Sequence, residues 1–330
     1  MEQELYKIRS ASACIKSAYT LFGSNLKTIF RRLWIPSLVF AFIMAAIVWT
    51  SSFTRSTLLS SLSASAPHAA AASGKALALG ILQNSLLVLM VIALVWLIAS
   101  LVTMLNKFGF RRNLLQTTKI AILHMAIYLI MTIILAIPIV IAMLYQMKSN
   151  QTAQGADALH ATATAASQQA MALQTIFSPT VLGAIGLAII LWLVFELLLL
   201  PIYYFYMKYL MEPIHMRTHL WKSFKTGFRH WGFLFLTFFM MGLLLLCLFV
   251  VLFMPLGILS TAQSQSFAGV LMGDPSGLPN HMLFLQFLTA LVTFFIFAFI
   301  LIWGELVLYH AYGSIEQKEI ERKAHSSIKN

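Results

Sequence analysis

Residues 177–208 read FSPTVLGAIGLAIILWLVFELLLLPIYYFYMK and carry one acidic side chain, Glu196, in an otherwise apolar run. A helix rises 1.5 Å per residue, so about 20 apolar residues cover the roughly 30 Å hydrocarbon core of a bilayer. This run therefore predicts a membrane-spanning helix. Comparable apolar runs recur through the rest of the chain and set its fold class.

The composition belongs to a membrane protein. Of 330 residues, 60% are hydrophobic and 10% are charged, whereas soluble domains average roughly 45–50% and 25%. We predict an all-α polytopic bundle that forms a single membrane domain over residues 1–330, with short amphipathic helices on the cytoplasmic side. The six predicted spans are residues 34–50, 77–105, 120–146, 177–207, 231–254 and 283–309, flanked by a cytoplasmic segment 1–33 and a cytoplasmic tail 313–330.

The net charge of +12 is distributed as the positive-inside rule requires. Nineteen of the 22 Lys and Arg residues fall within residues 7–32, 107–119, 208–229 and 318–329. These segments alternate with loops that carry only Arg55, Lys75 and Lys148. Cytoplasmic loops carry such an excess of basic residues. The pattern predicts that both termini lie in the cytoplasm and argues against a nucleic-acid surface.

Local signals place the element boundaries. Apolar residues spaced by three and seven predict an amphipathic helix over 2–22, which Gly23 ends, and a second short helix over 25–34. Pro36 suits the first turn of the first span, Pro138 predicts a kink in the third, and the fifth is expected to end near Pro255. Polar outer loops are expected at 51–76, 147–176 and 256–282.

The chain also shows signs of a threefold hairpin repeat. The words KTIFRR at 27–32 and KTGFRH at 225–230 each precede a span, and KFGFRR at 107–112 resembles them. Each even-numbered span has a tryptophan with a polar residue two or four positions after it, and we align Ser100, Glu196 and Glu305 in one column. A true repeat predicts three stacked hairpins, unlike the inverted repeats of many transporters.

Glu196 and Glu305 are the strongest candidates for a functional site. A carboxylate within a span is costly unless it is paired, protonated or hydrated, and Glu196 lies about 10 Å deep by helical rise. Tyr203 and Tyr312 each follow a glutamate by seven residues, on the same helix face. One interpretation is a proton- or cation-binding pair. The other is that each glutamate anchors an arginine of the inner segments, namely Arg31, Arg32, Arg111, Arg112 or Arg229.

Histidines supply weaker candidates. His124 lies one turn into the third span and is more typical of a polar packing residue than of a ligand. His215 and His219 have a spacing that can bind a metal, but no cysteine completes the set, so we predict no metal site and no cofactor. Membrane-enzyme motifs are missing from the sequence.

The short basic motifs that lead into the spans, KTIFRR and KTGFRH, resemble those of uncharacterised bacterial six-span proteins. These in turn resemble the membrane domain attached to some glycerophosphodiester phosphodiesterases. The resemblance covers most of the chain at the level of hydropathy layout and short basic words. It implies a bacterial inner-membrane protein and no catalytic residues, because the soluble phosphodiesterase barrel is not present in this sequence.

Three functional classes remain open from the sequence. The favoured one is a non-enzymatic protein that handles a small solute or lipid, or serves as a subunit of a membrane complex. An intramembrane enzyme is the second, and it would need Glu196, Glu305 and His124 to converge as acid–base groups. The third is a scaffold whose basic inner helices recruit a soluble partner or anionic lipids. The lipid bilayer is the expected partner in all three.

Overall fold

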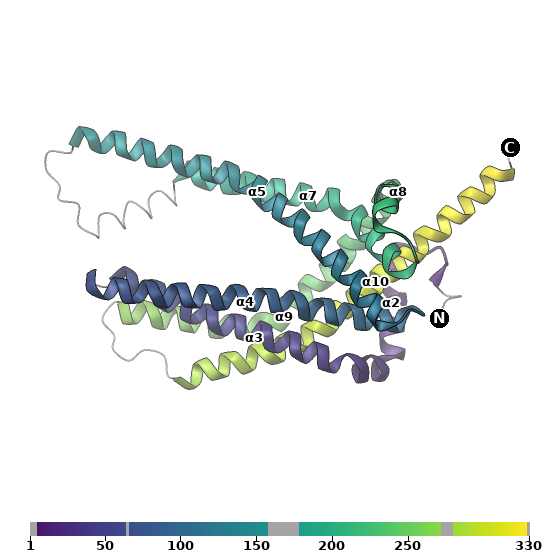
Figure 1. Ribbon diagram of the computed structural model, residues 1–330, viewed down its shortest axis with the longest axis horizontal. Coiled ribbons are helices and arrows are strands. Elements are labelled where there is room, and N and C mark those ends of the chain that lie inside the picture. The colour runs from purple at the N-terminus through teal and green to yellow at the C-terminus, as the bar shows by residue number, and fades with distance from the viewer. Residues whose placement is uncertain (1–4, 64–65, 158–177, 272–279, 329–330) are drawn as a thin grey trace. The chain divides into compact units, whose positions relative to one another are not determined.

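The computed structural model describes residues 5–63, 66–157, 178–271 and 280–328, and this part of the chain is α-helical apart from short turns (Figure 1). The all-α prediction is confirmed. Within the described ranges the helices are α2 (Ala11–Ser24), α3 (Leu26–Ser63), α4 (Ala66–Leu105), α5 (Phe110–Asp157), α7 (Pro179–Met211), α8 (Met216–Arg229), α9 (Trp231–Leu271) and α10 (Asn280–Ile328).

Six of these helices are long and apolar enough to cross a membrane. Each has a stretch with a mean hydropathy between 2.1 and 2.9, well above what a surface helix carries. The prediction of six spans is therefore confirmed by length and composition. The spanning stretches are Leu26–Thr54, Leu77–Leu105, Phe110–Gln146, Pro179–Met211, Trp231–Ser266 and His281–Ser327.

The N-terminal boundaries differ from the prediction. Residues 6–10 are not helical, and α2 begins at Ala11 with Ser10 as its cap, where the Ser10 hydroxyl accepts a hydrogen bond from the Ala13 N–H at 3.3 Å. Gly23 lies inside α2, because one glycine costs a helix only about 1 kcal/mol. The chain turns instead at Asn25. The predicted short helix over 25–34 is the first part of α3.

Two prolines predicted at helix ends lie inside helices. Pro36 is well inside α3, which begins at Leu26, and α9 continues past Pro255 to Leu271. Membrane helices tolerate proline because neighbouring groups satisfy the freed carbonyls. The outer segment 51–76 is also largely helical, since α3 runs to Ser63 and α4 begins at Ala66. Alanine-rich segments favour helix.

The chain divides into two compact units. One comprises residues 1–119 and 201–330, and the other comprises residues 120–200. The first contains α2, α3, α4, α8, α9 and α10, with the beginning of α5 and the end of α7. The second contains the remainder of α5 and α7.

The core of the first unit lies where α3, α4 and α10 meet. Leu33, Leu97, Leu101, Ile302 and Leu306 have 2% or less of their surface exposed and pack in one apolar cluster. α2 joins this cluster through Ala18, and α9 joins it through Met241. A second cluster, around Tyr309, Tyr312 and Ile315 of α10, includes Leu5 of the N-terminal segment.

A pair of asparagines fixes the turn between α4 and α5. Asn106 and Asn113 exchange two amide hydrogen bonds, of 3.0 and 2.9 Å, and Asn113 also donates to the Thr103 hydroxyl. Asn106 donates further to the carbonyl of Leu210 in α7. Asn113 is fully buried, and its donors are satisfied by these bonds, as burial of an amide requires. The turn is thereby tied to the end of α7.

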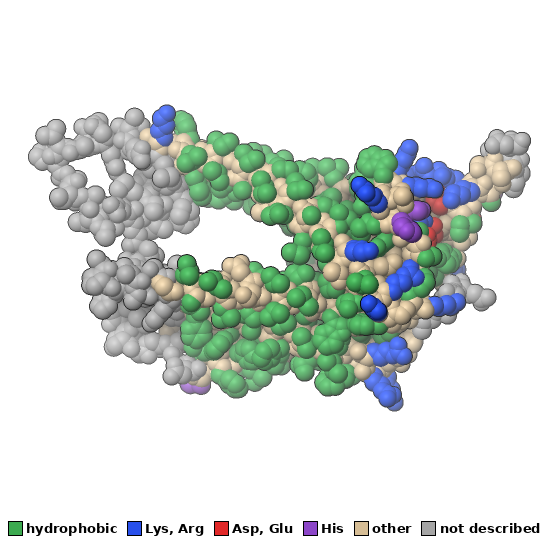
Figure 2. Space-filling view, viewed as in Figure 1, with side chains coloured by type: hydrophobic (Ala, Val, Ile, Leu, Met, Phe, Trp, Pro, Cys, Tyr) green, Lys and Arg blue, Asp and Glu red, His purple; other side chains and the backbone are tan. Residues whose placement is uncertain are grey.

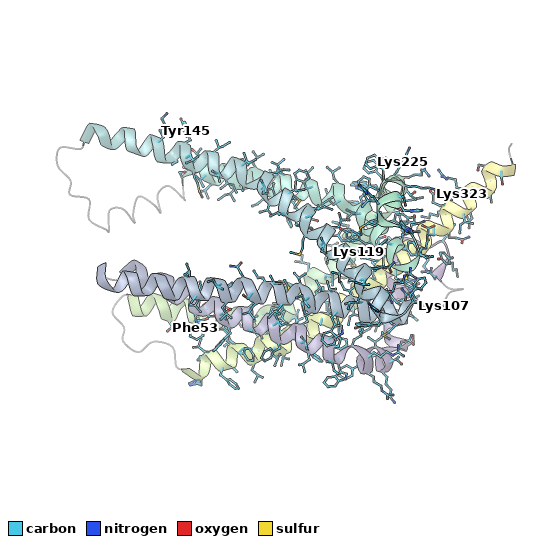
Figure 3. The ribbon with its side chains drawn as sticks, viewed as in Figure 1. Phe53, Lys107, Lys119, Tyr145, Lys225 and Lys323 are labelled. Carbon is cyan, nitrogen blue, oxygen red and sulfur yellow. The ribbon has the colours of Figure 1, made fainter. Side chains whose placement is uncertain are left out.

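Charge in the first unit is segregated along the helices. Figure 3 shows Lys107, Lys119, Lys225 and Lys323 near one end of the unit and Phe53 toward the other. Blue basic side chains gather at that same end in Figure 2, whereas green apolar side chains cover the helix shafts. Both chain termini lie in this unit. The basic residues thus gather at one end of the helices, and the cytoplasmic orientation of that end stays a prediction.

Candidate functional site

Glu196 is held by a residue that sequence reasoning missed. The Tyr128 hydroxyl of α5 donates a hydrogen bond to Glu196 Oε1 of α7 at 2.5 Å. The ring of His124, one turn before Tyr128, lies 4.5 Å from the Tyr128 ring, and His124 is within electrostatic reach of Glu196. The second unit therefore brings together two predicted site residues through Tyr128. The i, i+4 spacing places Tyr128 and His124 on one helix face, but a tyrosine in an apolar span is not by itself a distinctive signal.

The chemistry of this contact differs from that of an ion pair. A short bond from a hydroxyl to a carboxylate is among the stronger hydrogen bonds, but a neutral phenol cannot cancel a full negative charge. At membrane depth an ionised carboxylate remains costly. The Tyr128 hydroxyl is thus a hydrogen-bond donor to Glu196 and not a counter-ion.

Glu305 lies in α10 of the first unit and is half-buried. Within the described ranges no hydrogen bond or ion pair joins its carboxyl group to another residue. Its neighbour Gly304 lies close to the Met241 sulfur, where an added Cβ would sit 3.9 Å away. The surroundings of Glu305 are therefore mainly apolar. Its environment differs from that of Glu196, although the sequence aligned the two.

The remaining predicted polar residues have local roles. Ser100 donates to the Trp96 carbonyl of its own helix at 2.8 Å. The Tyr203 ring packs against the rings of Tyr206 and Phe238. The Tyr312 hydroxyl donates to Glu212 Oε1 at 2.6 Å and so belongs to a cluster at the basic end of the unit, apart from Glu305.

The five arginines proposed as anchors have different surroundings. Arg229 pairs with Glu319 at 3.1 Å. Arg112 lies over the Phe108 ring, with 3.3 Å between its guanidinium carbon and the ring centroid. The other three are exposed, and in the described part of the chain no carboxylate pairs with them: Arg31, Arg32 and Arg111.

Near the basic end of the first unit, three glutamates bind basic side chains: Glu212, Glu316 and Glu319. Glu316 accepts hydrogen bonds from the Tyr204 hydroxyl and from Lys208 Nζ, the latter at 2.5 Å. Lys208 also lies 3.7 Å from Glu212. These contacts connect α7 to α10. Both partners of Glu316 lie more than a hundred positions away in the chain, beyond the reach of a local sequence pattern.

Glu319 forms the second half of this arrangement. Its carboxylate contacts Arg229 at 3.1 Å, His230 at 2.9 Å and Arg322 at 2.9 Å. The Glu319 side chain is 8% exposed, whereas Arg229 and Arg322 are 41% and 52% exposed. One buried carboxylate therefore ties α8 and the start of α9 to α10, and we assign it a structural role.

Among the described residues, no group of three His, Cys, Asp or Glu side chains lies close enough to hold a metal ion. His219 Nδ1 lies 2.9 Å from the Thr218 hydroxyl and 3.3 Å from the His215 carbonyl oxygen. These contacts are local to the first turn of α8. The two cysteines are free: Cys14 is buried and Cys247 is exposed.

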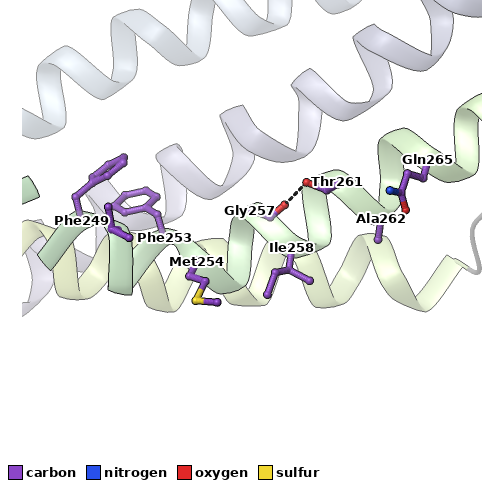
Figure 4. Close-up of a pocket in the computed structure, with 9 residues that line it drawn as sticks. Phe249, Phe253, Met254, Gly257, Ile258, Thr261, Ala262 and Gln265 are labelled. Carbon is purple, nitrogen blue, oxygen red and sulfur yellow. Dashed lines mark hydrogen bonds between the residues drawn. The ribbon is translucent and has the colours of Figure 1, made fainter. Parts of the chain in front are cut away.

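An open groove of about 620 Å³ runs along one face of α9 (Figure 4). Phe249, Phe253 and Ile258 line it, and the Thr261 hydroxyl donates to the Gly257 carbonyl at 2.9 Å. The hydroxyl is thus already used within the helix. A ligand site needs convergent polar groups in an apolar pocket, whereas this groove has the character of a lipid-facing surface.

Comparison with known proteins gives no match, since no family model fits the chain and no curated protein or solved structure is recognisably similar. The fold and the apolar helices identify a class: this is a multi-pass, all-helical membrane protein whose spans contact the lipid bilayer. The Tyr128–Glu196 contact joins two of these apolar helices, α5 and α7, within the second unit.

Proposed function

We propose that the protein handles a small solute or lipid within the membrane and that Glu196 binds the proton or cation that accompanies this step. The observation that carries the proposal is the Tyr128–Glu196 hydrogen bond of 2.5 Å. A carboxylate held by a neutral donor keeps its ability to exchange a proton, whereas one locked against arginine is held ionised. Intramembrane carboxylates with this freedom mark proton and ion pathways.

The experiment measures proton exchange directly. Purified protein is placed in lipid vesicles, and infrared difference spectra follow the protonated carboxyl band from about pH 4 to about pH 10, a range that spans the carboxyl and histidine groups. Glu196→Gln is expected to remove one titrating band, and Tyr128→Phe to displace its midpoint. Glu305→Gln is the matched control, because it removes an intramembrane carboxyl without the tyrosine contact.

The same vesicles then test whether proton movement is coupled to the movement of a solute or lipid. A panel of small organic ions and lipids is applied while an internal pH dye follows proton movement. The wild-type protein and Glu305→Gln are expected to move protons with one member of the panel, and Glu196→Gln is expected to lose this movement while it still elutes as folded protein. Proton movement that survives Glu196→Gln would refute the proposal.

A second role is favoured by α8. Trp221, Phe224 and Phe228 stack along this helix, and Trp221 is 74% exposed. Lys222 and Lys225 lie beside them on the same helix. Aromatic and basic residues together are typical of helices that lie at a headgroup surface. We propose that α8 contacts anionic lipids at the inner face, or a soluble partner there, in a protein that acts as a membrane-complex subunit.

This role rests on an orientation that we also propose: an inner-membrane protein with both termini in the cytoplasm. The basic end of the first unit supports it. A thiol introduced by Lys323→Cys should react with an impermeant maleimide in inverted vesicles and stay unreactive in intact cells. A relationship to the membrane domain of glycerophosphodiester phosphodiesterases is proposed on the hydropathy layout and the short basic motifs.

A further inference from the structure

A pocket of about 240 Å³ lies at the basic end of the first unit, between α2, α3, α4 and α10. Its polar lining residues are Asn25, Thr28, Arg32 and Thr103, and its apolar lining includes Leu101 and Leu306. A water molecule takes about 30 Å³, so the pocket accommodates a group of several heavy atoms. It is smaller than the roughly 300–1,000 Å³ of a pocket for a whole ligand.

Two of the four polar side chains are already occupied. The Asn25 amide donates to the Leu21 carbonyl at 3.0 Å and to the Ser24 hydroxyl at 3.1 Å. The Thr103 hydroxyl donates to the Ala99 carbonyl at 2.7 Å. Both side chains have therefore used their donors within the protein. They shape the pocket and offer a ligand no further donor.

The other two polar side chains retain their donors. Thr28 and Arg32 are one helical turn apart on α3, so their side chains lie on the same face. Within the described ranges no hydrogen bond or ion pair engages the Thr28 hydroxyl or the Arg32 guanidinium. A guanidinium offers five N–H donors in a planar fork that matches a phosphate group.

The other residues that line the pocket exclude a cationic ligand and favour a ligand that carries a hydrocarbon chain. None of the lining residues is acidic. Leu101 and Leu306 belong to the apolar core and have 2% and 1% of their surface exposed. The apolar part of the lining also includes Ile29, Met104 and Leu105. A ligand with an anionic head and an apolar body satisfies both parts of the lining.

We propose that this pocket binds the phosphate-bearing headgroup of an anionic phospholipid, with Arg32 and Thr28 as the donors to its phosphate oxygens. Its position supports the lipid as the source, because it lies where the spans begin and the basic side chains gather, at the level of headgroups. The proposal is independent of proton exchange at Glu196, since it rests on the first unit alone.

The chain supplies a matched control on the adjacent residue. Arg31 is exposed like Arg32 but lines a separate, open surface groove with Lys27, Phe30 and Trp34. The two arginines have the same charge and almost the same depth on α3. General attraction to a negative membrane surface would therefore weaken equally in Arg31→Gln and Arg32→Gln. Binding in a specific pocket would weaken in Arg32→Gln and not in Arg31→Gln.

The test is native mass spectrometry of the full-length protein released from vesicles of phosphatidylglycerol and phosphatidylcholine. The wild-type protein is expected to retain one phosphatidylglycerol in preference to phosphatidylcholine. Arg32→Gln should weaken this retention about tenfold, the usual effect of losing one charge-assisted contact. Arg31→Gln should stay within about twofold of wild type. Arg32→Lys should be intermediate, because it keeps the charge and loses the fork.

Three results would overturn the proposal. Equal losses in Arg31→Gln and Arg32→Gln would show diffuse surface electrostatics. Unchanged retention in Arg32→Gln would show that the pocket holds no lipid. Displacement of the lipid by millimolar inorganic phosphate, with phosphate retained in its place, would show a free-anion site. Arg32 is exposed, so its variants are expected to fold, and an unchanged thermal midpoint verifies this.

Discussion

The backbone of Arg9 and the hydroxyl of Ser314 exchange two hydrogen bonds although 305 positions separate them in the chain. The Arg9 N–H donates to Ser314 Oγ at 3.0 Å, and Ser314 Oγ donates to the Arg9 carbonyl at 3.2 Å. Beside them the Leu5 carbonyl lies directly over Gly313, where it leaves no room for a Cβ. The N-terminal segment, residues 5–9, is therefore fastened to α10.

Gly313→Ala should release the N-terminal segment. The added methyl group would collide with the Leu5 backbone and side chain, and forced overpacking typically costs about 1–3 kcal/mol. The thermal midpoint in detergent should fall, and a protease should cut before residue 10 more quickly. Gly257→Ala is the matched control, since nothing lies within 4 Å of its Cβ position and alanine favours a helix by about 1 kcal/mol. Equal midpoints for the two variants would contradict this packing.

Glu319→Gln should destabilise the basic end of the first unit. The substitution keeps the shape of the side chain but leaves Arg229, His230 and Arg322 without their shared carboxylate. Both arginines are about half exposed, so water screens part of the loss. We expect a decrease of about 1–2 kcal/mol in the free energy of unfolding.

The control for that substitution lies two residues further along α10. Glu321 is exposed, and its carboxylate accepts a hydrogen bond from the Gln317 amide at 3.1 Å. Glu321→Gln should change the free energy of unfolding by less than about 0.5 kcal/mol, as is usual for surface positions. Denaturant titrations of both variants in one detergent provide the comparison, and similar losses would argue against a structural role for Glu319.

Cys14 should react slowly with maleimides in the folded protein. It is fully buried in α2, and this burial raises the pKa of its thiol to about 11, although Arg9 and Lys318 partly oppose the shift. Only the thiolate reacts. At pH 8 about one thiol in a thousand is ionised with this pKa, against about a quarter for an ordinary cysteine. Labelling should therefore be at least about 100-fold slower than in unfolded protein.

The rate at which Cys14 is labelled should increase with pH. Raising the pH toward 11 ionises the thiol, so the labelling rate should rise about tenfold for each pH unit between about 8 and 10. Mass spectrometry of a Cys247→Ser variant reads Cys14 alone, and protein in strong detergent supplies the unfolded rate. Fast labelling at pH 8 would show that α2 is not packed as described.

Several boundaries could not be read from local sequence. Pro36 and Pro255 were expected to mark helix ends, yet α3 and α9 pass through both. The rule that proline marks a helix end comes from helices in water, where the hydrogen bond that proline removes is not easily replaced. Gly23 likewise failed to end a helix because its cost is small against the packing of α2 on α10.

The candidate site, too, could be predicted only in part from the sequence. Glu196 was evident from sequence because a charge in an apolar run is rare. Tyr128 was not, because a tyrosine is unremarkable in a span and its partner is 68 residues away. The alignment of Glu196 with Glu305 predicted similar roles, whereas their surroundings differ in the structure. The threefold repeat stays a prediction.

The sequence by itself determined that the chain forms six long apolar helices and that its basic residues concentrate in alternate segments. Helix length and hydropathy are local properties, and a bilayer selects them without reference to the rest of the fold. Only the tertiary structure decided that Tyr128 holds Glu196, that Glu319 collects three basic side chains, and that Arg32 opens onto a pocket. Each of these depends on helix rotation and register, which packing between distant segments sets.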